Sequence, residues 1–299
     1  MTALPSPEDG AGVTTVLKAD NVSVTLGGNR IIHEVTTELR RGELTALIGP
    51  NGAGKSTLFS ALAADIEPSA GRVLLDGRDI RSFKPGALAL ERAVLPQDQV
   101  VRFSFSVEEI VGLARLSHDT SPARDSEIIT ASMDRAEGGH LRRRDVQPLS
   151  GGEKSRSGFA RVLAQTTPVI LLDEPTAALD LRHQELVLRT ARQLSDDGAC
   201  VVTVLHDLNL ATAYSDRVIM MSDGALVADD SPAEVFTAER VSEIYRQPVM
   251  VIEHPESGCP LVLSSDRPRG DWRGGHAEWS PTEARARRAG ASARRARPR

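Results

Sequence analysis

The feature that most constrains this chain is a glycine-rich loop, Gly-Pro-Asn-Gly-Ala-Gly-Lys-Ser-Thr, at residues 49–57. The apolar run Leu44–Ile48 before it predicts a buried strand, and Leu58–Ala64 after it has the composition of a helix. In this context the spacing G-x-x-x-x-G-K-[ST] is typical of a phosphate-binding loop, because glycines let backbone N–H groups surround an anion at a helix N-terminus. We expect Lys55 to reach the β- and γ-phosphates of a nucleotide and Ser56 to bind Mg²⁺. The alternative is a chance glycine turn.

The bulk composition describes a soluble globular protein of one or two domains. The chain has 299 residues, of which 40% are hydrophobic, and a net charge of −5. Residues 264–299 hold ten arginines against four acidic residues, which leaves the main body at −11 and argues against nucleic-acid binding. No stretch free of charged residues exceeds 11 residues, whereas a membrane-spanning helix needs about 20 apolar residues. The N-terminus carries no secretory signal pattern, and Cys200 and Cys259 have no metal-like spacing, which suits a reducing cytosol.

The order of patterns along the chain predicts an α/β fold. After a disordered leader at residues 1–12, short β-rich runs between residues 13 and 39 and at residues 72–77 favour an antiparallel sheet. Helical periodicity without a clear strand marks an insertion at about residues 104–148. Apolar strands then alternate with helices, which is typical of a mainly parallel sheet covered on both faces. We therefore expect one nucleotide-binding domain at residues 13–263.

The last segment, residues 264–299, is rich in Arg, Gly, Ala and Pro and is predicted to be a disordered tail. It has two interpretations. The tail either contacts anionic lipid headgroups or is a solvated, dispensable extension.

Two acidic residues follow a second buried strand, Val169–Leu172. Asp173 suits a phosphate-bound Mg²⁺, which takes a protein carboxylate. Glu174 suits a base that activates water in line with the γ-phosphate. Taken alone, the pair could equally be a helix cap.

About 20 residues upstream of these acids, Leu149–Glu153 reads Leu-Ser-Gly-Gly-Glu and opens a predicted helix. A Ser-Gly-Gly helix start is a second anion-binding end, or by itself a plain N-cap. With the glycine loop and the Asp-Glu strand, it makes the chain resemble the ATP-binding-cassette (ABC) ATPases, a group of P-loop NTPases, over about residues 15–263. The resemblance implies the same fold class: a mainly parallel sheet core, an antiparallel β-subdomain and a helical insertion.

The resemblance also implies the residues of the ATP site. Its Walker A loop is Gly49, Pro50, Asn51, Gly52, Ala53, Gly54, Lys55, Ser56 and Thr57, and its Walker B strand is Val169–Asp173. Glu174 matches the catalytic glutamate and His206 the switch histidine that contacts the γ-phosphate. Gln97 matches the Q-loop glutamine, so that Ser56, Gln97 and Asp173 are the expected Mg²⁺ ligands. Seen singly, Gln97 and His206 could be a surface amide and a loop histidine.

A second copy of the chain is implied by the remaining motifs. Ser150, Gly151, Gly152 and Glu153 match the signature that holds the ATP of the partner subunit, and Asp180 matches the D-loop. The resemblance predicts an ATP-sandwich dimer that couples hydrolysis to two membrane permease subunits, at the cytoplasmic face of the cell membrane. An extracytoplasmic substrate-binding protein is the further expected partner. One departure is that Leu26-Gly27-Gly28 stands where many relatives stack an aromatic residue on adenine.

Several stretches are similar to the importers of iron chelates, haem and vitamin B12. Leu179–Gln184 and Leu205–Ala211 resemble their segments after the D-loop and around the switch histidine. Ala93–Gln97 with Phe103–Glu109 resembles the haem branch more closely. The resemblance therefore predicts ATP-driven haem import. The alternatives are ferric siderophore or cobalamin import, and a stand-alone ABC ATPase that transports nothing.

Overall fold

The computed structural model describes residues 14–97 and 104–265. The chain divides into two compact units, Met1–Ser265 and Asp266–Arg299, and the second lies wholly outside the described residues. The leader predicted at residues 1–12 and all of the predicted tail after Ser265 also lie outside them. All of the described helices and strands belong to the first unit.

A six-stranded sheet forms the centre of this unit, in the order β10-β9-β3-β8-β7-β6. Its first five strands in the chain run parallel, and β10 pairs with β9 in the antiparallel direction. Every residue of β3, β7 and β8 is buried, as the unbroken apolar runs predict. The strands are β3 (Leu44–Ile48), β6 (Arg92–Leu95), β7 (Val169–Asp173), β8 (Cys200–Val204), β9 (Arg217–Ser222) and β10 (Ala225–Asp230).

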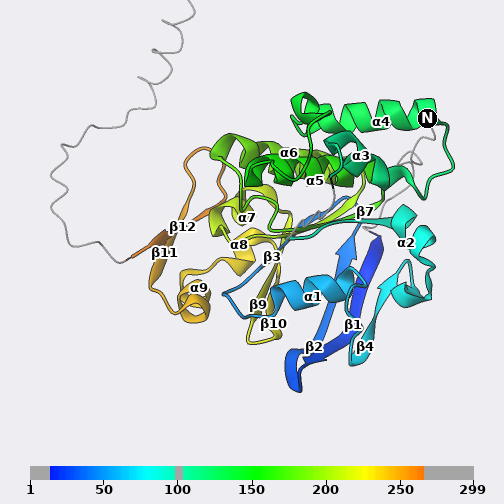
Figure 1. The fold of residues 1–299 in the computed structure, drawn as a ribbon. Coiled ribbons are helices and arrows are strands. Elements are labelled where there is room, and N and C mark those ends of the chain that lie inside the picture. The colour runs from blue at the N-terminus through cyan, green and yellow to red at the C-terminus, as the bar shows by residue number, and fades with distance from the viewer. Residues whose placement is uncertain (1–13, 98–103, 266–299) are drawn as a thin grey trace, which may run out of the picture. The chain divides into compact units, whose positions relative to one another are not determined.

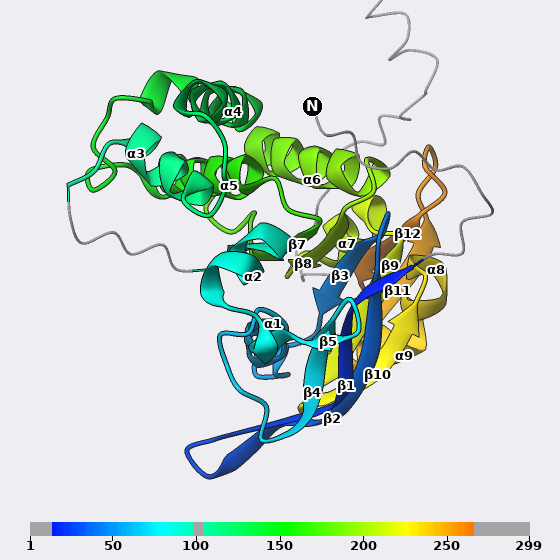
Figure 2. The same cartoon turned by 90° about the vertical axis from the view of Figure 1, so that its right-hand side faces the viewer.

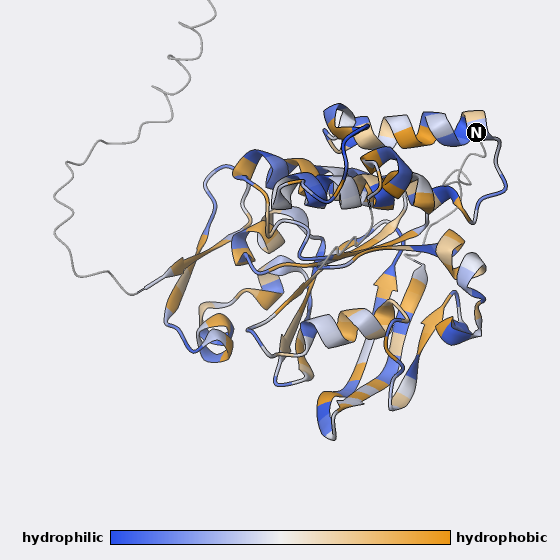
Figure 3. Cartoon of the chain, in the orientation of Figure 1, coloured by the Kyte–Doolittle hydropathy of each residue, from blue (hydrophilic) through white to orange (hydrophobic). Residues whose placement is uncertain are grey.

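Both faces of the central sheet are covered, and alternate residues of β7 pack into two different hydrophobic cores. Val169 and Leu171 belong to one core with helix α1 (Lys55–Leu62) and the antiparallel sheet. Ile170 and Leu172 belong to a second core with α5 (Gly151–Gln165) and α6 (Leu181–Asp196). Figure 3 shows the central strands mostly in hydrophobic colours, with helices of mixed colour around them. The predicted two-sided burial is confirmed.

The antiparallel sheet has the order β2-β1-β4-β5 and stands beside α1 (Figure 2). Its strands are β1 (Thr15–Leu26), β2 (Asn29–Arg40), β4 (Ala70–Leu75) and β5 (Arg78–Asp79). Two of the predicted β-rich runs, Arg30–His33 and Val35–Leu39, are parts of the single strand β2. Glu34, which separates them, has φ of 54° within a register shift, and its N–H donates to the Ser23 hydroxyl. A local bulge therefore interrupts the pattern without ending the strand.

The predicted helical insertion is confirmed as a helical region, with one isolated bridge between Ser106 and Asp145. Its helices α3 (Val107–Gly112) and α4 (Pro122–Arg135) pack on α5. The other helices are α2 (Pro85–Glu91), α7 (Leu208–Tyr214), α8 (Pro232–Val235) and α9 (Ala238–Tyr245). A hairpin of β11 (Val249–Glu253) and β12 (Pro260–Ser264) ends the unit. None of the described helices is long and apolar enough to cross a bilayer.

Candidate functional site

The site lies where four neighbouring parallel strands of the central sheet end. The glycine loop follows β3, His206 follows β8, Asp173 and Glu174 end β7, and Gln97 follows β6. The carboxyl edge of an open α/β sheet is where such folds bind ligands. A cavity of about 750 Å³ opens there, lined by Ile31, Asn51, Gly52, Gly54, Lys55, Ser56, Thr57, Gln97, Glu174 and His206.

The glycine loop requires glycine at its two ends. Gly49 has φ of 147°, and a Cβ there would lie 2.3 Å from the carbonyl oxygen of Met221. Gly54 has φ of 95° as the N-cap of α1, and a Cβ there would lie 2.7 Å from Cδ1 of Ile32. Side chains are excluded at both points, so the loop keeps its backbone N–H groups open to an anion.

Lys55 is held at the mouth of this loop in a buried position. Its Nζ donates to the carbonyl oxygens of Gly49 at 2.7 Å and Pro50 at 3.0 Å. Burial lowers the pKa of Lys55, and the nearby carboxylates of Glu174 and Asp173 oppose that effect. The ammonium group therefore lies between two carbonyl oxygens and two carboxylates, next to the loop that would surround an anion.

Asp173 is the group with unmet bonding capacity. It is 7% exposed, and its Oδ1 is buried without a hydrogen-bond partner among the described residues. Burial, and then the charge of Glu174, raise the pKa of Asp173 to about 6. A buried, unpaired carboxylate oxygen is what a hard divalent cation requires, so the residues present fit Mg²⁺. Within residues 14–97 and 104–265 no cluster of three His, Cys, Asp or Glu could hold a metal, so phosphate oxygens would have to complete its shell.

Glu174 bridges two side chains from different loops. Its Oε1 lies 2.6 Å from Nε2 of His206, and its Oε2 accepts from Nε2 of Gln97 at 3.1 Å. The backbone of Glu174 has φ of 48°, a conformation in which non-glycine residues are strained. The structure thus brings together three residues that the sequence predicted separately.

Two further residues at this site escaped the sequence reasoning. Ile31 of β2 lines the cavity, whereas Leu26, from the segment where many relatives have the aromatic residue, does not. Tyr245 of α9 is half-buried, which raises its pKa to about 12, and its hydroxyl forms a hydrogen bond with the backbone of Gly49. The turn residues Gly27 and Gly28 could have indicated that Ile31 lies near the start of a strand. No local pattern marked Tyr245, because its partner lies almost 200 positions earlier.

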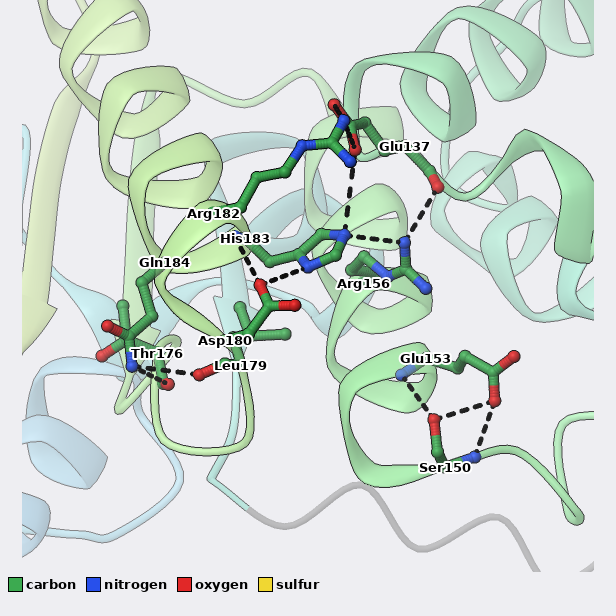
Figure 4. Close-up of polar contacts among 10 residues, drawn as sticks. All are labelled: Glu137, Ser150, Glu153, Arg156, Thr176, Leu179, Asp180, Arg182, His183 and Gln184. Carbon is green, nitrogen blue, oxygen red and sulfur yellow. Dashed lines mark hydrogen bonds and ion pairs between the residues drawn. The ribbon is translucent and has the colours of Figure 1, made fainter.

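The Ser-Gly-Gly segment starts a helix, as predicted, but lies apart from this cavity. Ser150 is the N-cap of α5 and forms a capping box with Glu153, shown in Figure 4. Gly152 packs closely, since a Cβ there would lie 3.2 Å from the carbonyl oxygen of Ala178. None of residues 150–153 lines the cavity. Asp180 likewise lies outside it, as the N-cap of α6.

A second cavity, of about 420 Å³, opens between α2 and the ends of α1 and α5. It is lined by Ala64, Ile80, Arg81, Phe83, Pro85, Leu88, Ala89, Arg92 and Gln165. Burial lowers the pKa of Arg92, and its Nε is buried without a hydrogen-bond partner in the described part of the chain. Its Nη2 lies 3.6 Å from Asp65. This groove therefore combines apolar side chains with two arginines, Arg81 and Arg92, and the Nε of Arg92 has no acceptor among the described residues.

Comparison with known proteins gives consistent matches. The model of the family described as ABC transporter matches residues 32–177. A hemin import ATP-binding protein HmuV from Rhodococcus jostii is 44% identical over 90% of this chain and 91% of its own length. The HmuV protein of Nocardia farcinica is 48% identical over 78% and 82%. Among solved structures, a dimeric bacterial ABC transporter cassette matches with a TM-score of 0.66 at 25% identity, covering 72% of this chain and 98% of that one.

Proposed function

Because the chain belongs to the ABC transporter family, as one of its ATP-binding and ATP-hydrolysing members, we propose that it drives the import of haem across the cytoplasmic membrane. The observation that carries the choice of haem is the similarity, at 44% and 48% identity over most of both chains, to proteins named for hemin import. None of the histidines is assigned to haem, since an ATPase subunit need not touch the cargo.

ATP binding is assigned to the 750 Å³ cavity. The glycine loop, Gly49–Thr57, surrounds the phosphates with backbone N–H groups, and Lys55 exchanges its two carbonyl partners for β- and γ-phosphate oxygens. Ser56, Gln97 and Asp173 would hold Mg²⁺, with the unpaired oxygen of Asp173 as the supporting observation. When bound, Mg²⁺ neutralises the charge that develops on the phosphates. Ile31 is placed to pack on the adenine in the absence of an aromatic residue.

Hydrolysis is assigned to Glu174 and His206. Glu174 accepts the proton of a water molecule that attacks the γ-phosphate, and ADP leaves as the bond to the γ-phosphorus breaks. In the structure both oxygens of Glu174 are already bonded, to Gln97 and His206. Each oxygen has a second lone pair, so the carboxylate can accept a hydrogen bond from the water while Gln97 and His206 hold its orientation.

A second copy of this chain completes the site. Ser150, Gly151 and Gly152 present a helix N-terminus, yet they do not line the cavity of their own subunit. We propose that they contact the ATP of a partner copy, in an ATP-sandwich dimer. The similarity to a dimeric ABC transporter cassette supports this arrangement.

The transport complex would include two permease subunits and an extracytoplasmic substrate-binding protein, with this chain peripheral at the cytoplasmic face of the membrane. The groove beside α2 is our candidate for the permease contact. Arg81 and Arg92 in its lining favour a helical segment that ends in carbonyl or carboxylate groups, because the end of such a segment is negative.

The test is a strain that lacks the gene, supplied with wild type or with Glu174→Gln, and grown on haem as sole iron source. Wild type restores growth. The variant does not, because its amide keeps the size of Glu174 but cannot take a proton. In the purified transporter the variant should lose at least about 100-fold in ATP turnover and accumulate as an ATP-bound dimer.

Two further growth tests of the same strain control for cargo: one with a ferric siderophore as sole iron source, and one in a medium in which growth requires cobalamin uptake. Growth in these two media should not depend on the gene. Dependence on the siderophore or on cobalamin in place of haem would reassign the cargo. Undiminished turnover by the variant would reject Glu174 as the base, and growth independent of the gene on every source would favour a non-transport ATPase.

A further inference from the structure

The loop that carries Glu174 is fastened at its far end to the helix that begins with Ser150. We propose that His183 is the positioning residue in this fastening: it ties Asp180, at the end of the loop, to Arg156 on α5. Movement of α5 on contact with the ATP of the partner subunit is thereby transmitted to the Glu174 of its own subunit. This inference rests on the proposed dimeric ATPase function.

The imidazole of His183 lies between Asp180 and Arg156, as Figure 4 shows. Its Nδ1 is 2.6 Å from Oδ1 of Asp180, and its Nε2 is 3.0 Å from Nη1 of Arg156. A guanidinium can only donate hydrogen bonds, so Nε2 accepts, and the proton resides on Nδ1, which donates to Asp180. In this one tautomer the ring meets both requirements, and the ring is only 18% exposed.

The neighbours of His183 reinforce the same junction. Arg182 donates to both carboxylate oxygens of Glu137 at 2.8 Å, and Arg156 donates to the backbone carbonyl of Glu137 at 3.2 Å. The two arginines come from α6 and α5, so Glu137 links both helices to the end of the helical insertion. Of His183, Arg156 and Arg182, only His183 forms a hydrogen bond with a residue of the loop, Asp180.

The loop itself has little freedom once its end is held. Gln184 Nε2 donates to the carbonyl oxygens of Thr176 at 3.2 Å and Leu179 at 3.1 Å. Gly152 packs against the carbonyl of Ala178 in the middle of the loop. Residues 174–180 are therefore in contact with the start of α5 and are bonded at their end through His183. A displacement of α5 cannot leave the loop unchanged.

Two substitutions separate the two bonds of the imidazole. His183→Asn retains an N–H donor near the position of Nδ1 and so keeps the bond to Asp180, but it does not reach Arg156. His183→Gln places an amide oxygen near the position of Nε2 and so keeps the bond to Arg156, but loses the donor to Asp180. If His183 transmits between helix and loop, both halves are needed.

The measurement is ATP hydrolysis by the assembled transporter, as kcat, KM and Hill coefficient. Both variants should lower kcat about tenfold and reduce the Hill coefficient, with KM for ATP within about twofold of wild type, because the cavity does not include His183. Arg189→Gln is the matched control on α6, since that side chain is 71% exposed and bonds Glu185 on the same helix. It should behave as wild type.

A purely structural role predicts a different pattern. In that case kcat would follow the melting temperature of each variant, and the variant that keeps the helix-capping bond to Asp180 would recover full activity. Either of these results, or an unchanged kcat and Hill coefficient in both variants, overturns the proposal. If the proposed ATPase function is wrong, the wild-type complex itself will not hydrolyse ATP. That result differs from a failure of the His183 proposal, in which wild type is active and the variants match it.

Discussion

Asp173 and Glu174 are adjacent carboxylic acids in opposite environments. Glu174 has a hydrogen-bond partner on each oxygen. Asp173 is more deeply buried, has one oxygen without a partner among the described residues, and has a pKa raised to about 6 by burial and by its neighbour. Folding therefore favours the protonated form of Asp173, and at neutral pH the ionised carboxylate costs stability that a bound cation recovers.

This contrast gives a prediction for Asp173→Asn. The folded protein binds the Asp173 proton more tightly than the unfolded chain, in which the pKa of this group is near 3.8. The free energy of unfolding of wild type therefore falls as the pH rises from about 4 through 6, and it remains at the lower value above pH 6. A shift of about two units corresponds to about 3 kcal/mol at most. Without nucleotide, the variant should be about 2 kcal/mol more stable than wild type at pH 8, measured by denaturant unfolding.

The control is the same pair of proteins at pH 5, where wild-type Asp173 is largely protonated and the difference should shrink. A stability difference that is equal at both pH values would contradict the assignment. Added Mg²⁺ with ATP should stabilise wild type more than the variant, because the variant keeps the glycine loop and Lys55 but lacks the anionic ligand for the cation.

At the scale of elements, helices α3 and α5 begin in the same way. Ser106 caps α3 and Ser150 caps α5, each in a capping box with the glutamate three residues later. The backbone N–H of that glutamate donates to the serine hydroxyl at 3.3 Å in both helices. The two caps should therefore contribute equally to stability, and only one of them is followed by two glycines.

This likeness provides an internal control for the role of Ser150. Ser106→Ala and Ser150→Ala should each cost about 1 kcal/mol of unfolding free energy, because each removes a cap. Only Ser150→Ala should also reduce ATP hydrolysis by the assembled transporter, by about tenfold or more, since its hydroxyl is assigned to the ATP of the partner. Equal loss of activity in both variants would show that Ser150 acts as a cap alone.

The elements that the sequence predicted share strong local signals, and those it did not predict lack them. Unbroken apolar runs located β3, β7 and β8, and periodicity located the helical insertion. Strand β6 has only four residues, and β10 reads Ala-Leu-Val-Ala-Asp-Asp with no buried residue. The hairpin β11–β12 has a six-residue connection without a two-residue turn signature. Only β6 pairs with a strand distant in the chain, β7. Strand β10 pairs with the preceding β9, and β11 pairs with β12, but none of β10, β11 and β12 has a buried residue, so they lack a strong apolar pattern.

At the scale of the whole molecule, the order of the strands assembles the site. Strand β8 lies between β3 and β7, so His206 stands between the glycine loop and Glu174 although 32 residues separate it from Glu174 in the chain. The motifs predicted most of the residues that line the cavity, because phosphate chemistry demands particular side chains. Their mutual contacts, the unpaired oxygen of Asp173 and the placement of Ile31 follow from the sheet and could not be derived from spacing.

The groove beside α2 leads to a prediction about assembly with the permease. Arg92→Met keeps the length of the apolar stem and removes a buried N–H that has no partner in the described residues, so the isolated subunit should be as stable as wild type or up to about 1 kcal/mol more stable. Binding to the permease should weaken about tenfold, because the groove loses a positive charge that faces the negative end of the permease segment. Co-purification with the permease and thermal melting of the subunit measure the two effects.

Arg124→Met, on the exposed start of α4, is the control. It removes only an exposed ion pair with Glu127, so permease binding and the melting temperature should stay as in wild type. If Arg92→Met lowers the melting temperature and leaves assembly intact, the groove is structural and the permease binds elsewhere. A loss of assembly in a subunit that remains stable would show that the charge of Arg92 serves the contact with the permease, because the fold does not need it.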